Sequence, residues 1–178
     1  MKKNQRLQLW LDSWGGTGTQ WPPEYAAFVA LFHAGDYYEA HDILEHRWLS
    51  CADGSRSFFQ ALIQLAGAFV HFQKHRLFPD HPTHGRRLAP GARLLDLAVA
   101  RLVPYGSAHM NLDLLELQSR CARWSGIALE RCNPLEVGPP PRLPERDFPF
   151  PDLPPEALAA IRGGGEAGPQ TAFSPIQS

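Results

Sequence analysis

The sequence has few cysteines, almost no net charge and no long hydrophobic run. Its three cysteines, Cys51, Cys121 and Cys132, are odd in number and include no Cys-x-x-Cys pair, which argues against a disulfide framework and a zinc ribbon. Reduced thiols are typical of the cytosol, so we expect a cytoplasmic protein. Because no stretch approaches the roughly 18 apolar residues of a membrane span, we expect no membrane partner.

Basic and acidic residues nearly balance in this chain. Lys and Arg total 17, Asp and Glu total 18, and the formal net charge is −1. This balance provides no electrostatic footprint for nucleic acid, which we therefore do not expect as a partner. A chain of 178 residues can bury roughly 70% of its unfolded surface, so its core needs no disulfide or structural metal.

We divide the chain into three regions. The last is set apart by proline, because 11 of the 17 prolines lie beyond residue 132. Residues 1–23 form an irregular arm that carries three of the five tryptophans, and residues 24–132 form the domain proper. Residues 133–178 form a proline-rich tail, in which regular helices are disfavoured. We expect the first half of the tail to dock, since it holds Phe148, Phe150 and Leu153, and its end to be disordered.

The middle of the chain follows the helical period, with no alternation typical of strands. We predict an all-α fold, a compact antiparallel bundle of about five helices. Gly35 should end the first helix, Asp36 with Glu39 should form a capping box on the second, and Asn111 should cap the last. The predicted helices cover residues 24–34, 36–49, 56–75, 85–102 and 111–131.

The third predicted helix is apolar on almost every side, which places it at the centre of the domain. A narrow polar stripe interrupts its apolar surface at positions i, i+4, i+7 and i+11: Gln60, Gln64, Gly67 and His71. The second helix presents His41 and Glu45 four residues apart. We predict that these groups form a buried His/Glu/Gln cluster, because an unpaired buried polar group costs about 1–3 kcal/mol.

Three interpretations of this cluster remain open. The first is a hydrogen-bonded network that fixes the register of core helices, in a domain that associates with itself or with a protein partner. The second is a divalent metal site for Zn, Fe or Mn, with His41, Glu45 and His71 as ligands of a hydrolase-like enzyme. The third is a pocket for a small organic ligand beside Gly67. The proline-rich tail adds a further hypothesis, a scaffold that binds its partner through the tail.

Three motifs in this region resemble a known family. Residues 35–48 read Gly-Asp-Tyr-Tyr-Glu-Ala-His-Asp-Ile-Leu-Glu-His-Arg-Trp and resemble the E-A-H-E-x-x-E-x-x-W signature of domain of unknown function 309 (DUF309). Residues 58–66, Phe-Phe-Gln-Ala-Leu-Ile-Gln-Leu-Ala, resemble its F-x-Q-G-L-I-Q-x-A motif, with Ala61 where glycine is usual. Residues 91–95, Gly-Ala-Arg-Leu-Leu, resemble its G-A-x-x-L-L element. The resemblance implies a small, all-helical bacterial or archaeal domain and no established activity. Apart from the divalent metal of the second interpretation, we predict no cofactor.

Overall fold

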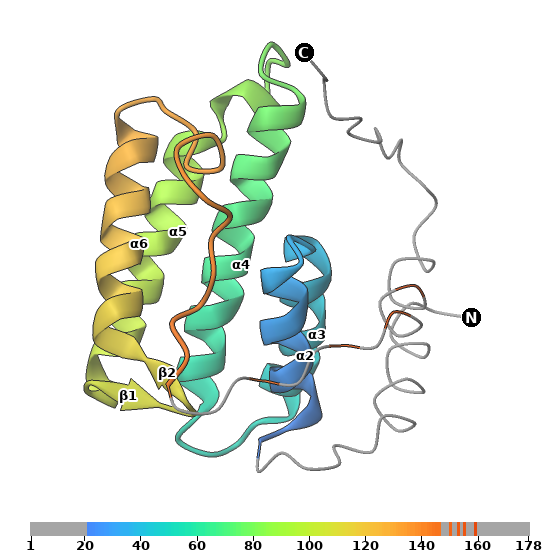
Figure 1. Cartoon of the computed structure of the whole chain (residues 1–178), viewed down its shortest axis with the longest axis vertical. Coiled ribbons are helices and arrows are strands. Elements are labelled where there is room, and N and C mark those ends of the chain that lie inside the picture. The colour runs from blue at the N-terminus through green and yellow to red at the C-terminus, as the bar shows by residue number, and fades with distance from the viewer. Residues whose placement is uncertain (1–20, 147–149, 151–152, 154, 156–158, 160–178) are drawn as a thin grey trace.

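The computed structural model describes residues 21–146 and, further along the chain, residues 150, 153, 155 and 159. Most of the tryptophan-bearing arm and the end of the tail lie outside the described residues. The described part holds five α-helices, which confirms the predicted all-α class (Figure 1): α2 (Pro23–His33), α3 (Tyr37–Ser50), α4 (Arg56–Leu77), α5 (Leu88–Leu102) and α6 (Leu114–Leu129). Two short 3-10 turns, η1 (His84–Arg86) and η2 (Val103–Tyr105), flank α5.

Helix α4 is the centre of the bundle, as its all-round apolar sequence predicts. It packs against α3 on one side and α5 on the other, while α2 pairs with α3 and α6 with α5 (Figure 1). Its buried residues include Phe58, Phe59, Phe69 and Phe72, each fully inaccessible to solvent. Phe69 and Phe72 meet edge to face at 5.5 Å between centroids, an arrangement that aromatic quadrupoles favour.

The structure confirms Asp36 as the N-cap residue of α3 but without the predicted side-chain cap, and it moves the start of the last helix. Asp36 precedes α3 but makes no side-chain cap hydrogen bond, because its ψ of 59° departs from the extended geometry of an N-cap. The last helix begins at Leu114 and is capped by Asp113, whose Oδ1 accepts from the Glu116 amide at 3.0 Å. Gly35, by contrast, ends α2 as predicted, since its φ of +81° lies in the left-handed region.

A small hairpin replaces the predicted start of the last helix. Strands β1 (Ala108–His109) and β2 (Leu112–Asp113) pair antiparallel, with His109 opposite Leu112. Met110 and Asn111 form its two-residue turn with φ values of 45° and 64°, as a type I′ turn requires. Asn111 therefore serves the turn and not a helix cap. Strands of two residues are too short to show a periodicity, which is why the sequence did not indicate them.

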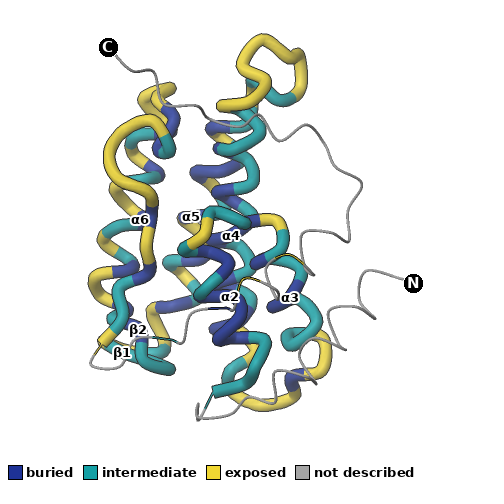
Figure 2. Tube along the Cα trace, turned by 45° about the vertical axis from the view of Figure 1, so that its right-hand side comes forward, coloured by how far each residue is buried: buried dark blue, intermediate teal, exposed yellow. Residues whose placement is uncertain are grey.

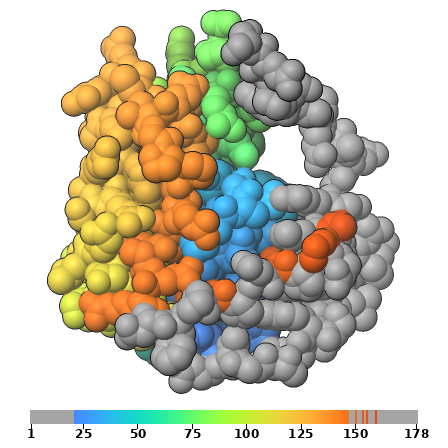
Figure 3. Space-filling view, viewed as in Figure 1, coloured from blue at the N-terminus to red at the C-terminus, as the bar shows by residue number. Residues whose placement is uncertain are grey.

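The first part of the proline-rich tail, residues 133–146, crosses the bundle as an irregular segment that we call the strap. Figures 1 and 3 show it running along α6 and reaching α2. Asn133 is one of two buried polar residues among those described, and it donates to the Phe72 carbonyl at 2.8 Å. The Leu143 amide donates to His33 Nε2 at 3.0 Å, and the Asp113 amide donates to the Pro144 carbonyl at 2.9 Å. The strap is thus fixed to the bundle at both ends.

The buried residues lie where the helices face one another. In Figure 2 the inward faces of the helices are buried, while the loop after α4 and the middle of the strap are exposed. All three cysteines carry free thiols, in agreement with the prediction of no disulfide framework. None of the described helices combines the length and the apolar character needed to cross a membrane.

Candidate functional site

The polar stripe of α4 lies against a row of residues spaced seven apart on α5. Arg101 Nε donates to Gln64 Oε1 at 3.1 Å, and Arg87 at the start of α5 places a terminal guanidinium nitrogen 3.2 Å from His71 Nδ1. Arg87, the N-cap residue of α5, is 14 residues from Arg101, a separation that places both on about the same side of the helix. Because α4 and α5 are antiparallel, the C-terminal end of the stripe, at His71, lies beside the start of α5.

Gly67 occupies the middle of the stripe between these two hydrogen bonds. A Cβ atom at this position would lie 3.4 Å from Leu94 Cδ1 of α5 and 3.8 Å from His41 Cδ2 of α3. Leu94 is midway between Arg87 and Arg101, so all three follow one line on α5. His41 approaches Gly67 of the stripe from α3, but among the described residues no hydrogen bond joins His41 or Glu45 to Gln60, Gln64 or His71, so the contact between the two predicted parts is one of packing.

The cluster is half-buried, which corrects the prediction of a buried one. His41, Glu45, Gln60, Gln64 and His71 all retain intermediate exposure. The physical reason is the layout of the bundle, because α3 and α5 pack on the two sides of α4 and the stripe lies between them.

His71 stands in a cationic environment. Burial, together with the nearby cations Arg87, Lys74 and Arg93, lowers the pKa of His71 below its usual 6.5. The neutral imidazole is consequently favoured. Its Nδ1 can then accept a hydrogen bond from the Arg87 guanidinium, a group that can only donate. Arg87 also donates through Nε to His84 Nδ1 at 2.9 Å, so one guanidinium joins two imidazoles.

The predicted ligands His41 and Glu45 lie together with a third residue, Asp42. Within the described part of the chain, one ligand atom from each of these three residues lies within 4.8 Å of the others. His41 Nδ1 is 3.3 Å from Asp42 Oδ1, and their side chains are 31% and 24% exposed. His71, the third ligand in the predicted metal set, is not in this group. Asp42 was missed, although it stands beside His41 in the sequence.

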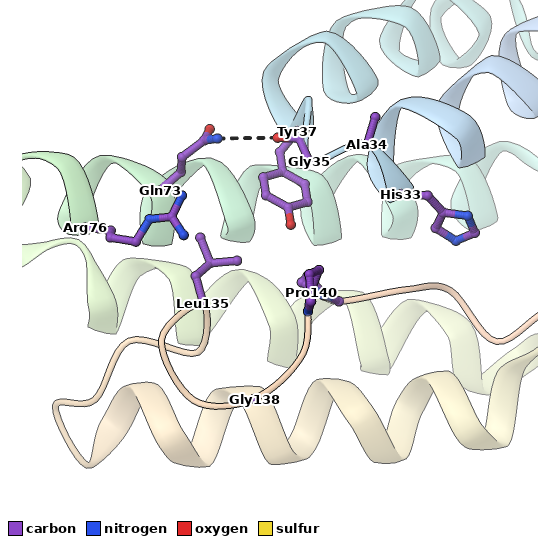
Figure 4. A pocket seen from close by; sticks show the side chains of 10 residues that line it. His33, Ala34, Gly35, Tyr37, Gln73, Arg76, Leu135, Gly138 and Pro140 are labelled. Atoms are coloured by element: carbon purple, nitrogen blue, oxygen red, sulfur yellow. Dashed lines mark hydrogen bonds between the residues drawn. The ribbon is translucent and has the colours of Figure 1, made fainter. Parts of the chain in front are cut away.

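A second feature is a cavity of about 360 Å³ beneath the strap, which we call the strap cavity (Figure 4). Its walls come from three distant segments: the turn between α2 and α3, the last turns of α4, and the strap. Gln73 Nε2 donates to the Gly35 carbonyl at 3.3 Å and so ties the first wall to the second. The sequence did not indicate this cavity, because its lining residues are up to 108 positions apart, His33 and Pro141 being the most distant.

Part of the chain matches a known protein family. Residues 25–77, which span almost all of α2 and the whole of α3 and α4, match the family described as Domain of unknown function (DUF309). This segment contains every residue of the predicted cluster, but neither of the arginines on α5 that contact it. No curated protein and no solved structure matches the chain.

Proposed function

We propose, from the premise that residues 25–77 belong to the DUF309 family, for which no activity is established, that this chain is a non-catalytic binding domain. In this proposal the polar stripe of α4 is a structural network that holds α4 in register against α5. The observation that carries it is the pair of contacts from α5, Arg101 to Gln64 at 3.1 Å and Arg87 to His71 at 3.2 Å. Acceptors engaged by these arginines need no bound ligand to satisfy them.

The two contacts lie far apart along α5, so together they define one register between the helices. They lie two heptads apart on α5, and Leu94 fills the space over Gly67 between them. Sliding α5 by one turn would separate both guanidinium groups from their acceptors and move the Leu94 side chain off the glycine. A network of this kind favours one packing of the helices over the shifted alternatives.

A double-mutant cycle tests the network. We expect Gln64→Ala and Arg101→Ala to show a coupling free energy of about 0.5–1.5 kcal/mol in urea unfolding, the range of an ordinary intramolecular hydrogen bond. The matched control is the exposed pair Arg120–Glu116, four residues apart on α6 with Nε and Oε1 2.8 Å apart, for which about 0.3–0.5 kcal/mol is expected. Coupling no larger in the stripe than in this control would count against a structural network.

Association with a second copy or a protein partner belongs to the same proposal. Large apolar side chains remain exposed at both ends of α6, with Leu115 61% and Leu129 62% accessible. Scattered exposed leucines are ordinary on a soluble surface, so the mass of the protein in solution is the direct test of association. Sedimentation equilibrium of the full chain is expected to show a concentration-dependent mass if the protein associates with itself.

A divalent metal site is the second candidate, and the grouping of His41, Asp42 and Glu45 favours it. An imidazole with two carboxylates suits Zn²⁺, Fe²⁺ or Mn²⁺, and an ion held there would support a hydrolase-like reaction. Elemental analysis of untagged protein separates the two candidates. Stoichiometric metal that is lost in His41→Ala would favour the enzyme, whereas metal-free protein with intact network coupling would favour the binding domain.

A further inference from the structure

The strap cavity has a roof that is fixed at both ends. Asn133 anchors one end through the Phe72 carbonyl, and Asn133 Oδ1 also accepts from the Leu135 amide at 3.0 Å. The other end is held by the hydrogen bond between the Leu143 amide and His33. Between these anchors the strap contains three consecutive prolines, whose fixed φ limits its conformations. The roof can therefore keep its shape over a space of about 360 Å³ without side chains that fill it.

Arg76 supplies a positive charge to this cavity from the last turn of α4. Among the residues that the structure describes, none forms a hydrogen bond or an ion pair with the Arg76 guanidinium. An arginine presents five donors in a planar fork that matches a carboxylate. Its position on the cavity wall makes these donors available to a bound molecule.

Tyr37 supplies a second polar group opposite the strap. Its side chain is almost fully buried, at 4% exposure, and Figure 4 shows its hydroxyl directed toward the strap, with Arg76 on one side. Burial raises the pKa of Tyr37 to about 12, with Arg76 nearby acting in the opposite direction and the Asp36 carboxylate adding to the rise. The hydroxyl consequently remains protonated at neutral pH and can donate a hydrogen bond. Apolar surface comes from the Tyr37 ring and from Leu135 and Pro140 in the strap.

We propose that the strap cavity binds a small organic carboxylate, with its oxygens on Arg76 and the Tyr37 hydroxyl and its apolar body against Leu135 and Pro140. One guanidinium and one hydroxyl match the single charge and the two oxygens of a carboxylate. A phosphate dianion would leave one charge uncompensated in a half-apolar space. The proposal rests on the binding role proposed above and is independent of the stripe network.

A binding experiment with benzoate tests this assignment on the full chain. Benzoate has the required charge and a flat apolar body, benzamide has the same shape without the charge, and inorganic phosphate has charge without an apolar body. Titrations are followed by amide chemical shifts of ¹⁵N-labelled protein. We expect benzoate to cause saturable shifts in residues 33–37, 73–76 and 135–138, and benzamide and phosphate to cause much smaller ones.

Substitutions assign the recognition to the two polar groups. Arg76→Gln should weaken benzoate binding by about tenfold or more, since hydrogen bonds to charged groups are the stronger class. Tyr37→Phe should weaken it by a smaller factor. The control is Arg86→Gln, which removes an exposed arginine outside the cavity lining and should leave binding unchanged. Because Arg76 is exposed, its replacement leaves the core intact, and the amide spectrum of the free variant checks this.

Several outcomes would overturn the proposal. If benzoate caused no saturable shifts, or if benzamide bound equally well, the cavity would not recognise a carboxylate. Equal losses in Arg76→Gln and Arg86→Gln would indicate attraction to overall positive charge and not to this cavity. Phosphate that displaces benzoate and depends equally on Arg76 would indicate a site for simple anions. A negative result here, together with positive coupling in the stripe, would leave the structural network standing and reject only the carboxylate site.

Discussion

Replacing Gly91 by alanine is expected to destabilise the fold by about 2 kcal/mol, because no space exists for the added methyl group. A Cβ atom at this position would lie 2.4 Å from Phe72 Cε1, 2.9 Å from Cζ and 3.0 Å from Cδ1. Ordinary carbon contacts are about 3.5–4.0 Å, so the whole edge of the ring would have to move. Phe72 is fully buried and packs edge to face on Phe69, which leaves the ring little room.

The magnitude follows from two opposing effects. Overpacking of a core costs about 1–3 kcal/mol, and three close ring contacts place this site near the upper end. Alanine also gains up to about 1 kcal/mol over glycine inside a helix. Gly91 is the fourth residue of α5, in its first turn, where that gain is smaller. The balance is a loss of about 2 kcal/mol, or about 4–8 °C in the midpoint of thermal unfolding for a chain of this size.

Two other helical glycines serve as matched controls. Gly126 in α6 has no atom within 4 Å of an added Cβ, so Gly126→Ala should stabilise the protein by up to about 1 kcal/mol. At Gly67 the nearest atom, Leu94 Cδ1, is 3.4 Å away, and Gly67→Ala should lie between the other two. Urea unfolding followed by circular dichroism measures all three. If the Gly91→Ala variant were at least as stable as the Gly126→Ala variant, the close contact between Gly91 of α5 and Phe72 of α4 would be refuted.

Two further predictions concern His71 and the strap. Because the pKa of His71 is lowered in the folded state, the unfolded chain binds the proton more readily, and stability should fall as the pH drops from about 7.5 to about 5.5 through its unfolded pKa of about 6.5. His71→Gln should make the dependence of unfolding free energy on pH less steep, and an unchanged slope would contradict this. Asn133→Ala should cost about 0.5–1.5 kcal/mol, because it removes the side-chain hydrogen bond to the Phe72 carbonyl, which keeps its backbone donor within α4. Chemical denaturation measures this loss, and an unaltered midpoint would show that the strap does not depend on that anchor.

The apolar period of the sequence was sufficient to predict the all-α class and the central position of α4. An all-round apolar helix such as α4 can satisfy its surface only inside a bundle, so its sequence implies its place. Gly35 was predicted as a helix stop because a positive φ is a local property of glycine. The hairpin at Met110 and Asn111 was not predicted, since a two-residue strand leaves no pattern and methionine at positive φ is no turn signal.

Residues of the candidate site were found by sequence, but their partners were not. Gln64 and His71 were selected because polar groups on an apolar helix require hydrogen bonds, which is a general requirement of burial. Their partners Arg101 and Arg87 looked like ordinary charged residues on α5, and only the antiparallel packing of α4 and α5 shows what they contact. The same packing left the cluster half-buried, which the helical period of a single helix cannot reveal.

The sequence by itself determined the local and periodic features of this protein: its helices, its central helix and the polar stripe upon it. These depend on residues a few positions apart, whose relation the helix geometry fixes. Only the tertiary structure decided which arginines meet the stripe, that Asp42 lies with His41 and Glu45, and that a cavity exists beneath the strap. The lining of that cavity combines His33, Arg76 and Pro141, and contacts over such separations are set by how the helices and the strap pack together, which no local pattern records.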